Sequence, residues 1–202
     1  MRDFGLLIVG DEILSGKRQD KHLTKVIEML GARGLSLAWA RFVGDHRGRI
    51  TATLKEAFAS GDIVFSCGGI GATPDDHTRQ CAAAALGVPL ELHPVARDLI
   101  LERMRDVAAE QGLPYEPERT DNQHRLNMGV FPQGAQIIPN PYNKIPGFSI
   151  GDVHFVPGFP VMAHPMIEAL LDGRYAALHG SHVMAERAVI VLGAMEATLT
   201  PL

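Results

Sequence analysis

The sequence has little cysteine and no cluster of positive charge. Its 202 residues include only two cysteines, Cys67 and Cys81, whose positions match no metal-binding spacing. Lys and Arg residues are scattered, and the formal net charge is −4. Because proteins that bind nucleic acids usually carry a basic patch, this composition argues against a nucleic-acid partner.

Long apolar runs are also missing. No window of about 18 apolar residues exists, so the sequence predicts no membrane span. The apolar part of the N-terminal stretch MRDFGLLIVGDEIL is short and leads directly into two acids, which is typical of a strand rather than a signal peptide. With no export signal and few cysteines, we expect a reduced, cytoplasmic setting.

Short apolar runs are present and alternate with helical patterns. Three runs predict strands, and amphipathic stripes separate them: Phe4–Val9, Leu35–Val43 and Asp62–Cys67. The first and the third have apolar residues on both faces, as in strands buried in a parallel sheet. The first ~90 residues therefore predict a β-α-β-α-β order, in which helices cover a mostly parallel sheet.

The second half of the sequence is less regular. Residues 94–126 have a helical composition that Pro114 and Pro117 interrupt. Later segments predict strands at Ala135–Ile138 and Val153–Val156, a helix at 161–172 and a possible strand at Arg187–Leu192. We expect one domain over residues 1–175 and a C-terminal extension over 176–202.

A glycine-rich loop follows the third predicted strand. Gly68, Gly69 and Gly71 precede Thr73-Pro74-Asp75-Asp76 and a helix, a layout that favours an anion site. No Lys-Ser/Thr follows, so the loop is not a Walker loop. A structural alternative makes Thr73 the helix N-cap with Asp76 three residues on, but it leaves the glycines unexplained. We therefore favour a ligand site.

Acidic residues stand where a phosphate would bind. Two unit charges about 4 Å apart repel by roughly 4 kcal/mol at an effective dielectric of 20, whereas a helix N-terminus returns only about 1–2 kcal/mol. Either a divalent cation intervenes, or Asp75 and Asp76 accept hydrogen bonds from an amino-heterocycle or a ribose. Asp11, Glu12 and Asp45 follow the first two strands and should converge on the same edge. The alternatives are a helix cap for Asp45 and a solvated turn for Asp11 and Glu12.

Several motifs, in order, resemble one known family. They match the molybdopterin-binding domain of competence/damage-inducible protein A (CinA), also found fused to FAD synthases, over roughly residues 4–172. The matching segments are Gly10–Gly16, Gly44-Asp45, Gly68–Arg79, Arg125–Met128, Pro132–Ala135, Pro139–Pro141, Pro146–Phe148 and Pro157–Pro160.

The resemblance implies a three-layer α/β/α fold, shared with proteins of molybdenum-cofactor biosynthesis, and a homo-oligomer. It implies that the cleft binds a small phosphorylated ligand, molybdopterin or a nucleotide pyrophosphate. The alternative function is a metal-dependent pyrophosphatase acting on ADP-ribose or FAD-type dinucleotides, with Mg²⁺ or another divalent cation.

These implications give specific residue roles. We expect Asp45 and Asp76 to be the catalytic acids. The residues expected to bind the cofactor are Gly68, Gly69, Gly71, Thr73, Asp75, Thr78 and Ser15. The candidate metal ligands are Asp11, Glu12 and Asp75.

Overall fold

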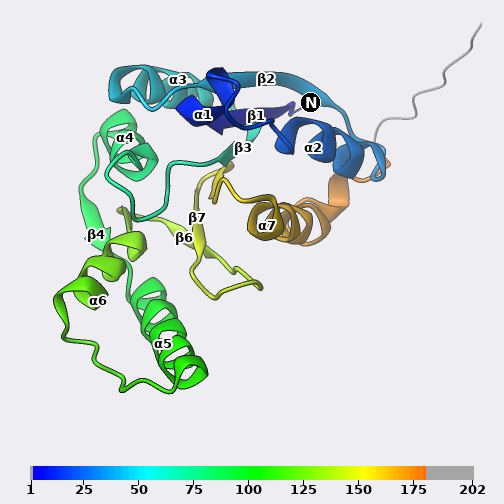
Figure 1. Cartoon of the computed structure of the whole chain (residues 1–202). Coiled ribbons are helices and arrows are strands. Elements are labelled where there is room, and N and C mark those ends of the chain that lie inside the picture. Colours follow the sequence, from blue (N-terminus) through cyan, green and yellow to red (C-terminus); the bar gives the residue numbers. More distant parts are fainter. Residues whose placement is uncertain (1, 181–202) are drawn as a thin grey trace, which may run out of the picture.

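The computed structural model describes residues 2–180 (Figure 1). The possible strand at Arg187–Leu192, and the expected extension beyond residue 180, lie outside the described residues. Within residues 2–180, no helix is both long enough and apolar enough to cross a membrane.

A six-stranded sheet forms the centre of the fold. Its strand order is β2-β1-β3-β8-β7-β6; the first four strands are parallel, and β7 and β6 are antiparallel to their neighbours. The bounds are β1 Phe4–Val9, β2 Leu37–Val43, β3 Ile63–Cys67, β6 Gln136–Ile138, β7 Gly147–Ile150 and β8 Val153–Val156. The three N-terminal strands are confirmed, and their carboxyl ends share one edge.

Helices cover both faces of this sheet. Leu6 and Ile8 on β1 pack in one core with α2 (His22–Gly31) and α7 (Pro160–Asp172). The alternate residues Leu7 and Val9 pack in a second core with two other helices, α3 (Arg47–Ser60) and α4 (Thr78–Leu86). Figure 1 shows the two pairs on opposite sides of the sheet. The three-layer α/β/α fold is confirmed, since a strand with a two-residue period buries both faces only between two layers.

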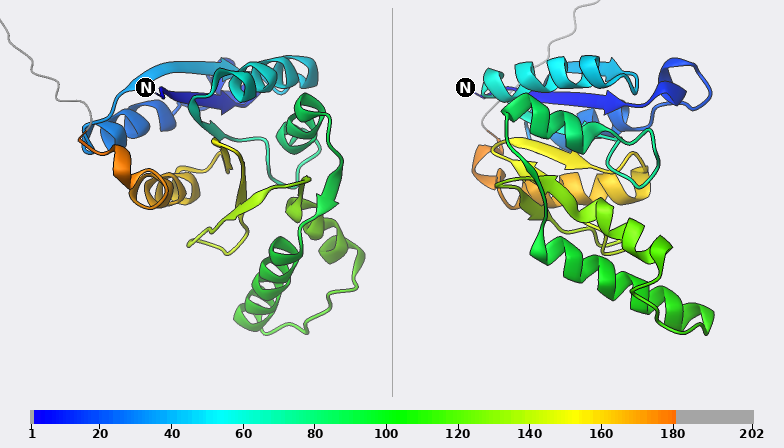
Figure 2. Two further views of the ribbon diagram at one scale, coloured as in Figure 1. Left: turned by 180° about the vertical axis from the view of Figure 1, so that it is seen from behind. Right: turned by 90° about the vertical axis from the view of Figure 1, so that its left-hand side faces the viewer.

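A smaller part of the chain lies beside the sheet. Helix α5 (Pro94–Gln111) extends away from the main sheet (Figure 2), and residues 112–119 separate it from α6 (Thr120–Arg125). The break at Pro114 and Pro117 therefore falls where the sequence indicated. A short 3₁₀-helix (Leu126–Gly129) leads into β5 (Val130–Pro132), which pairs antiparallel with β4 (Leu90–Leu92). Neither of these three-residue strands was predicted.

Strand β7 was also missed, because Ile145-Pro146-Gly147-Phe148 has the composition of a turn. A side chain at Gly147 would overlap the carbonyl oxygen of Phe155 on β8. The glycine in this strand therefore reflects close approach of a neighbouring backbone.

A chain of buried polar groups joins β7 and β8 to the C-terminal turn. The Tyr175 hydroxyl donates to Asp152 Oδ1 at 2.8 Å, and His154 Nε2 lies 2.6 Å from the same hydroxyl. Because Asp152 can only accept, His154 Nε2 must carry the proton donated to Tyr175. His154 Nδ1 then accepts from Ser149 Oγ at 2.7 Å. Every member of the chain has a partner, as buried polar groups require.

Candidate functional site

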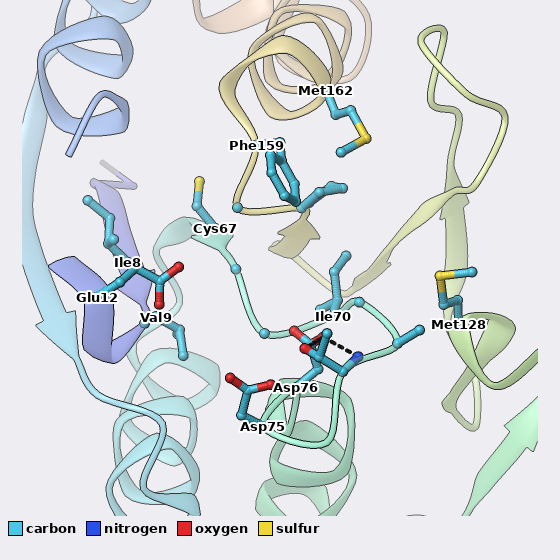
Figure 3. Close-up of a pocket in the computed structure, with 18 of the residues that line it drawn as sticks. Ile8, Val9, Glu12, Cys67, Ile70, Asp75, Asp76, Met128, Phe159 and Met162 are labelled. Atoms are coloured by element: carbon cyan, nitrogen blue, oxygen red, sulfur yellow. Dashed lines mark hydrogen bonds between the residues drawn. The ribbon is translucent and has the colours of Figure 1, made fainter. Parts of the chain in front are cut away.

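A cleft of about 460 Å³ opens at the carboxyl ends of β1, β3 and β8 (Figure 3). Its volume lies in the range of about 300–1,000 Å³ typical of small-molecule sites. Parallel sheets bind ligands at this edge because the loops that follow neighbouring strands meet there. Here the walls come from Gly10 after β1, residues 68–73 with Asp75 and Asp76 after β3, and Pro157–Phe159 after β8. The glycine loop thus lines this cleft along most of its length.

The glycines of this loop pack closely against their own chain. Gly68 has a φ of 103° and Gly69 a φ of 69°, a region that disfavours other residues. A side chain at Gly68 would overlap the carbonyl oxygen of Val9, and one at Gly69 would overlap Thr78 Oγ1. The structural explanation of the glycines is therefore stronger than the sequence indicated: close packing on β1 and α4 already requires them.

The same loop also presents unused hydrogen-bond donors. The backbone N–H groups of Gly69, Ile70, Gly71 and Ala72 have no acceptor among residues 2–180, and all four residues line the cleft. Successive backbone N–H groups of this kind form anion-binding concavities. An anion in the cleft would find donors here that the protein itself does not satisfy.

Asp76 closes the loop instead of capping the helix. Its Oδ2 accepts from the backbone N–H of Thr73 at 2.9 Å and from Thr73 Oγ1 at 2.5 Å. Helix α4 begins only at Thr78, with His77 at the N-cap position. The capping alternative for Thr73 is therefore wrong. The two donors from Thr73 offset part of the Asp76 charge at the point where repulsion of an anion was expected.

A buried arginine fixes the loop from behind. Arg79 on α4 is only 4% exposed, and its Nη2 donates to the Gly71 carbonyl at 2.7 Å. Its Nη1 donates to the Asn127 carbonyl. Burial lowers the pKa of this guanidinium. Arg79 thereby ties the cleft-lining glycine loop to the 3₁₀-helix that carries Met128, another residue of the cleft.

Asp45 and Asp11 hold the ends of β2 and β1 together. Asp11 N–H donates to Asp45 Oδ2 at 2.9 Å, and Asp45 N–H donates to Asp11 Oδ1 at 3.1 Å. The N-cap of α3 is His46, so the capping alternative for Asp45 is wrong. Burial raises the pKa of Asp45, and the nearby charges of Asp11, Asp75 and Glu12 act in the same direction. The expected convergence of acids is therefore present.

The structure brings most, but not all, of the sequence-predicted residues to the cleft. Those that line it are Glu12, Asp45, Gly68, Gly69, Gly71, Thr73, Asp75 and Asp76. Asp11 and Ser15 belong to the short helix α1 (Asp11–Leu14) and its C-cap, are exposed and do not line the cleft. Thr78 is fully buried beneath Gly69, which removes it from direct ligand contact.

The candidate metal ligands do not form a complete protein site. Among residues 2–180, no three His, Cys, Asp or Glu side chains are placed so that they could hold a metal ion. Asp11, Glu12 and Asp75 are therefore not a ligand set by themselves. Mg²⁺ commonly takes only one or two protein carboxylates and completes its shell with substrate phosphates and water. The acids of this cleft could therefore hold Mg²⁺ only together with substrate phosphate and water.

One wall of the cleft was not predicted from the sequence. Phe159 and Met162 give it an apolar side, and Figure 3 shows these two side chains well separated from Asp75 and Asp76. Pro157–Pro160 was noticed only as a family motif. Nothing in its composition indicated that its phenylalanine would line a cleft.

Comparisons with known proteins agree with this architecture. The family described as "Probable molybdopterin binding domain" matches residues 5–177. The chain belongs to this family. It is similar to a CinA-like protein of Anaeromyxobacter dehalogenans strain 2CP-C, with 35% identity over 160 residues, 77% of this chain and 37% of the relative. A CinA-like protein of Anaeromyxobacter sp. strain Fw109-5 is 34% identical over 179 residues, 87% of this chain and 41% of the relative. The chain thus spans about two fifths of these relatives.

Solved structures support the same fold. The protein CinA of Thermoplasma acidophilum, whose function is described as unknown, superposes with a TM-score of 0.68 at 25% identity, covering 85% of this chain and 96% of the other. The molybdopterin biosynthesis enzyme MoaB of Thermus thermophilus gives a TM-score of 0.51 at 24% identity, covering 88% of this chain and 96% of the other. The second likeness supports the fold alone. The resemblance drawn from the sequence motifs is confirmed.

Proposed function

We propose that the cleft binds a small phosphorylated compound, either a phosphorylated pterin of the molybdopterin type or a nucleotide pyrophosphate. The observation that carries this proposal is the row of unsatisfied N–H groups at residues 69–72 on the cleft wall. A phosphate offers the acceptors that these donors lack. Membership of a family described as molybdopterin-binding supports the same conclusion.

The acids of the cleft complement the other end of such a ligand. Pterins and adenine carry amino or ring N–H donors, and ribose carries hydroxyl donors. Glu12 and Asp45 line the cleft beside Gly10, as acceptors for those donors. We propose Asp45 and Asp76 as the principal functional acids; Asp76 acts by fixing the loop through Thr73. The ligand would thus place its phosphate at the loop and its donor-bearing part near the acids.

A metal-dependent pyrophosphatase is the second candidate function. It is favoured by the charges of Asp11, Asp75 and Glu12 around the raised-pKa carboxyl of Asp45, because a cation would relieve their mutual repulsion. Glu12 and Asp75, the two candidate metal ligands that line the cleft, would hold the ion together with substrate phosphate. A bound divalent ion would screen phosphate charge and lower the pKa of a water molecule.

Calorimetric titration tests the binding proposal. The wild-type chain is titrated with ADP-ribose, FAD and inorganic pyrophosphate, with Mg²⁺ or with EDTA, and small molecules released from freshly purified protein are identified by mass spectrometry. Gly71→Ala places a Cβ 2.6 Å from Asp76 Oδ2 and should weaken binding at least about tenfold. Gly31→Ala is the matched control: it lies at the end of α2, and the added Cβ would meet no atom within 4 Å apart from its chain neighbours and the backbone of its own helix.

Two outcomes would contradict the binding proposal: a wild-type chain that binds none of these compounds, or a Gly71→Ala variant that binds them as tightly. Turnover of ADP-ribose with Mg²⁺ that disappears in Asp45→Asn would support the pyrophosphatase. Binding that EDTA leaves unchanged, without turnover, would support the binding function alone. Sedimentation of the same samples tests the homo-oligomer that the family resemblance implies.

A further inference from the structure

Phe159 is an aromatic residue that folding leaves half uncovered at the edge of the cleft. Its side chain lines the cleft, yet the residue is 54% exposed. A single exposed apolar side chain is common on protein surfaces and needs no explanation by itself. This one lies beside a cleft that also presents backbone donors and acids.

The backbone around Phe159 is held on both sides. Its carbonyl accepts from the N–H groups of Met162 at 3.0 Å and Ala163 at 2.9 Å, in the first turn of α7. The preceding carbonyl, that of Gly158, is bonded by His22 Nε2 at 3.1 Å. Hydrogen bonds on both sides therefore hold the backbone from which the Phe159 ring extends.

The segment that carries Phe159 packs directly against the glycine loop. A Cβ at Gly158 would lie 3.3 Å from Gly68 Cα, so the two glycines bring the β3 and β8 loops into close approach. Gly68 N–H also donates to the Val156 carbonyl at 3.0 Å. These backbone contacts hold the segment that carries Phe159 at a constant position relative to the N–H donors of residues 69–72.

A cation supports the ring. The Arg18 guanidinium lies over the ring of Phe159, with Cζ 5.7 Å from the ring centroid, within the range of a cation–π contact. Arg18 is also the only Lys or Arg that lines the cleft within the described part of the chain, and its Nη1 lies 3.6 Å from Glu12 Oε1. Arg18, the cation of the cleft, thus lies beside Phe159. The carboxylates of Asp75 and Asp76 lie apart from Phe159 (Figure 3).

We propose that Phe159, supported by Arg18, is a stacking platform for a planar heterocycle of the ligand. This inference rests on the proposed binding function and names the residue that would hold the flat ring of the ligand. Stacking on Phe159 covers the exposed ring, while the N–H groups of residues 69–72 take the phosphate. Phosphates without a ring gain nothing from Phe159, so the platform makes the cleft selective for ring-bearing ligands.

The test compares ring-bearing and ring-free probes on the full chain. FAD and ADP-ribose are titrated beside inorganic pyrophosphate and ribose 5-phosphate into wild type, Phe159→Leu and Phe159→Tyr. Base stacking on one aromatic side chain corresponds to about ten- to hundredfold in affinity. Phe159→Leu should lose that factor for FAD and ADP-ribose and keep its affinity for pyrophosphate. Phe159→Tyr, which retains the ring, should bind all four probes within about threefold of wild type.

A matched control and a spectroscopic readout complete the design. Phe42→Leu alters a 38% exposed phenylalanine on β2 that does not line the cleft, and should leave all affinities unchanged. Upfield shifts of the adenine ring protons on binding should appear with wild type and disappear with Phe159→Leu.

The outcomes separate this inference from the proposed function. If wild type binds the phosphorylated probes and Phe159→Leu binds FAD and ADP-ribose equally well, the platform is refuted and the binding function stands. If Phe159→Leu loses pyrophosphate as much as FAD, Phe159 acts on the loop and not by stacking, which also refutes it. If wild type binds no phosphorylated probe, the proposed function fails and the platform fails with it.

Discussion

Replacing Arg79 by methionine should loosen the glycine loop and destabilise the whole chain. The substitution keeps an unbranched side chain in the buried space but removes the donors to the carbonyls of Gly71 and Asn127. Each bond from a charged donor contributes about 1.5–3 kcal/mol, so the two together amount to roughly 3–6 kcal/mol. The desolvation that lowers the pKa of Arg79 offsets part of this. We expect a net loss of about 2–4 kcal/mol in the free energy of unfolding.

Urea and thermal unfolding, followed by circular dichroism, measure this loss. In a chain of this size, it corresponds to a decrease in Tm of roughly 5–15 °C. Arg97→Met is the control: Arg97 is exposed on α5 and, within residues 2–180, its side chain pairs only with its neighbour Asp98, so its loss should change stability by less than about 0.5 kcal/mol. An Arg79→Met variant as stable as Arg97→Met, with unchanged ligand affinity, would show that the loop does not depend on this arginine.

Three further expectations follow from the same contacts. Gly69→Ala forces a Cβ onto Thr78 Oγ1 at a positive φ and should destabilise by more than about 2 kcal/mol in urea unfolding; an unchanged midpoint would contradict the packing. Asp45→Asn should raise Tm at pH 7 but not at pH 3, because the pKa of Asp45 is raised and its ionisation destabilises the fold as pH increases; an equal effect at both pH values would contradict this. Burial lowers the pKa of His154 to about 3, so stability should decrease by roughly 1.4 kcal/mol per unit as pH falls from 6.5 towards 3, and His154→Gln should flatten that profile in pH-dependent unfolding.

The predictions that succeeded depended on patterns local to the chain. Phe4–Val9 and the run ending at Cys67 are apolar on both faces, and the structure buries them between two helical layers. Strand β7 was missed because the residues around Gly147 have the composition of a turn. Strand Leu90–Leu92 was missed because three residues are too few to show an alternation of apolar and polar side chains. In such segments the pairing partner, and not the local sequence, decides the conformation.

Part of the candidate site was predictable for a related reason. Parallel strands deliver the loops that follow them to one edge, so Asp45, Asp76 and the glycine loop could be placed near one another from strand order alone. The capping roles considered for Thr73 and Asp45 were wrong. The N-cap of α4 is His77 and not Thr73, and the N-cap of α3 is His46 and not Asp45. Thr78 was expected to bind ligand, and the structure buries it under Gly69.

The sequence by itself determined the layered sheet, the edge that carries the loops and the residue types available there, because periodicity and glycine content act over a few neighbouring residues. Only the tertiary structure decided which hydrogen-bond donors in the cleft are left without an acceptor among residues 2–180 and which aromatic ring stays half exposed there. Arg79 reaches Gly71 across 8 positions of sequence and Asn127 across 48, and Phe159 meets Arg18 from the other end of the chain. Such contacts depend on distances through space between segments that no local pattern relates, so the donors left open at residues 69–72 and the ring left open at Phe159 emerge only when the chain is folded.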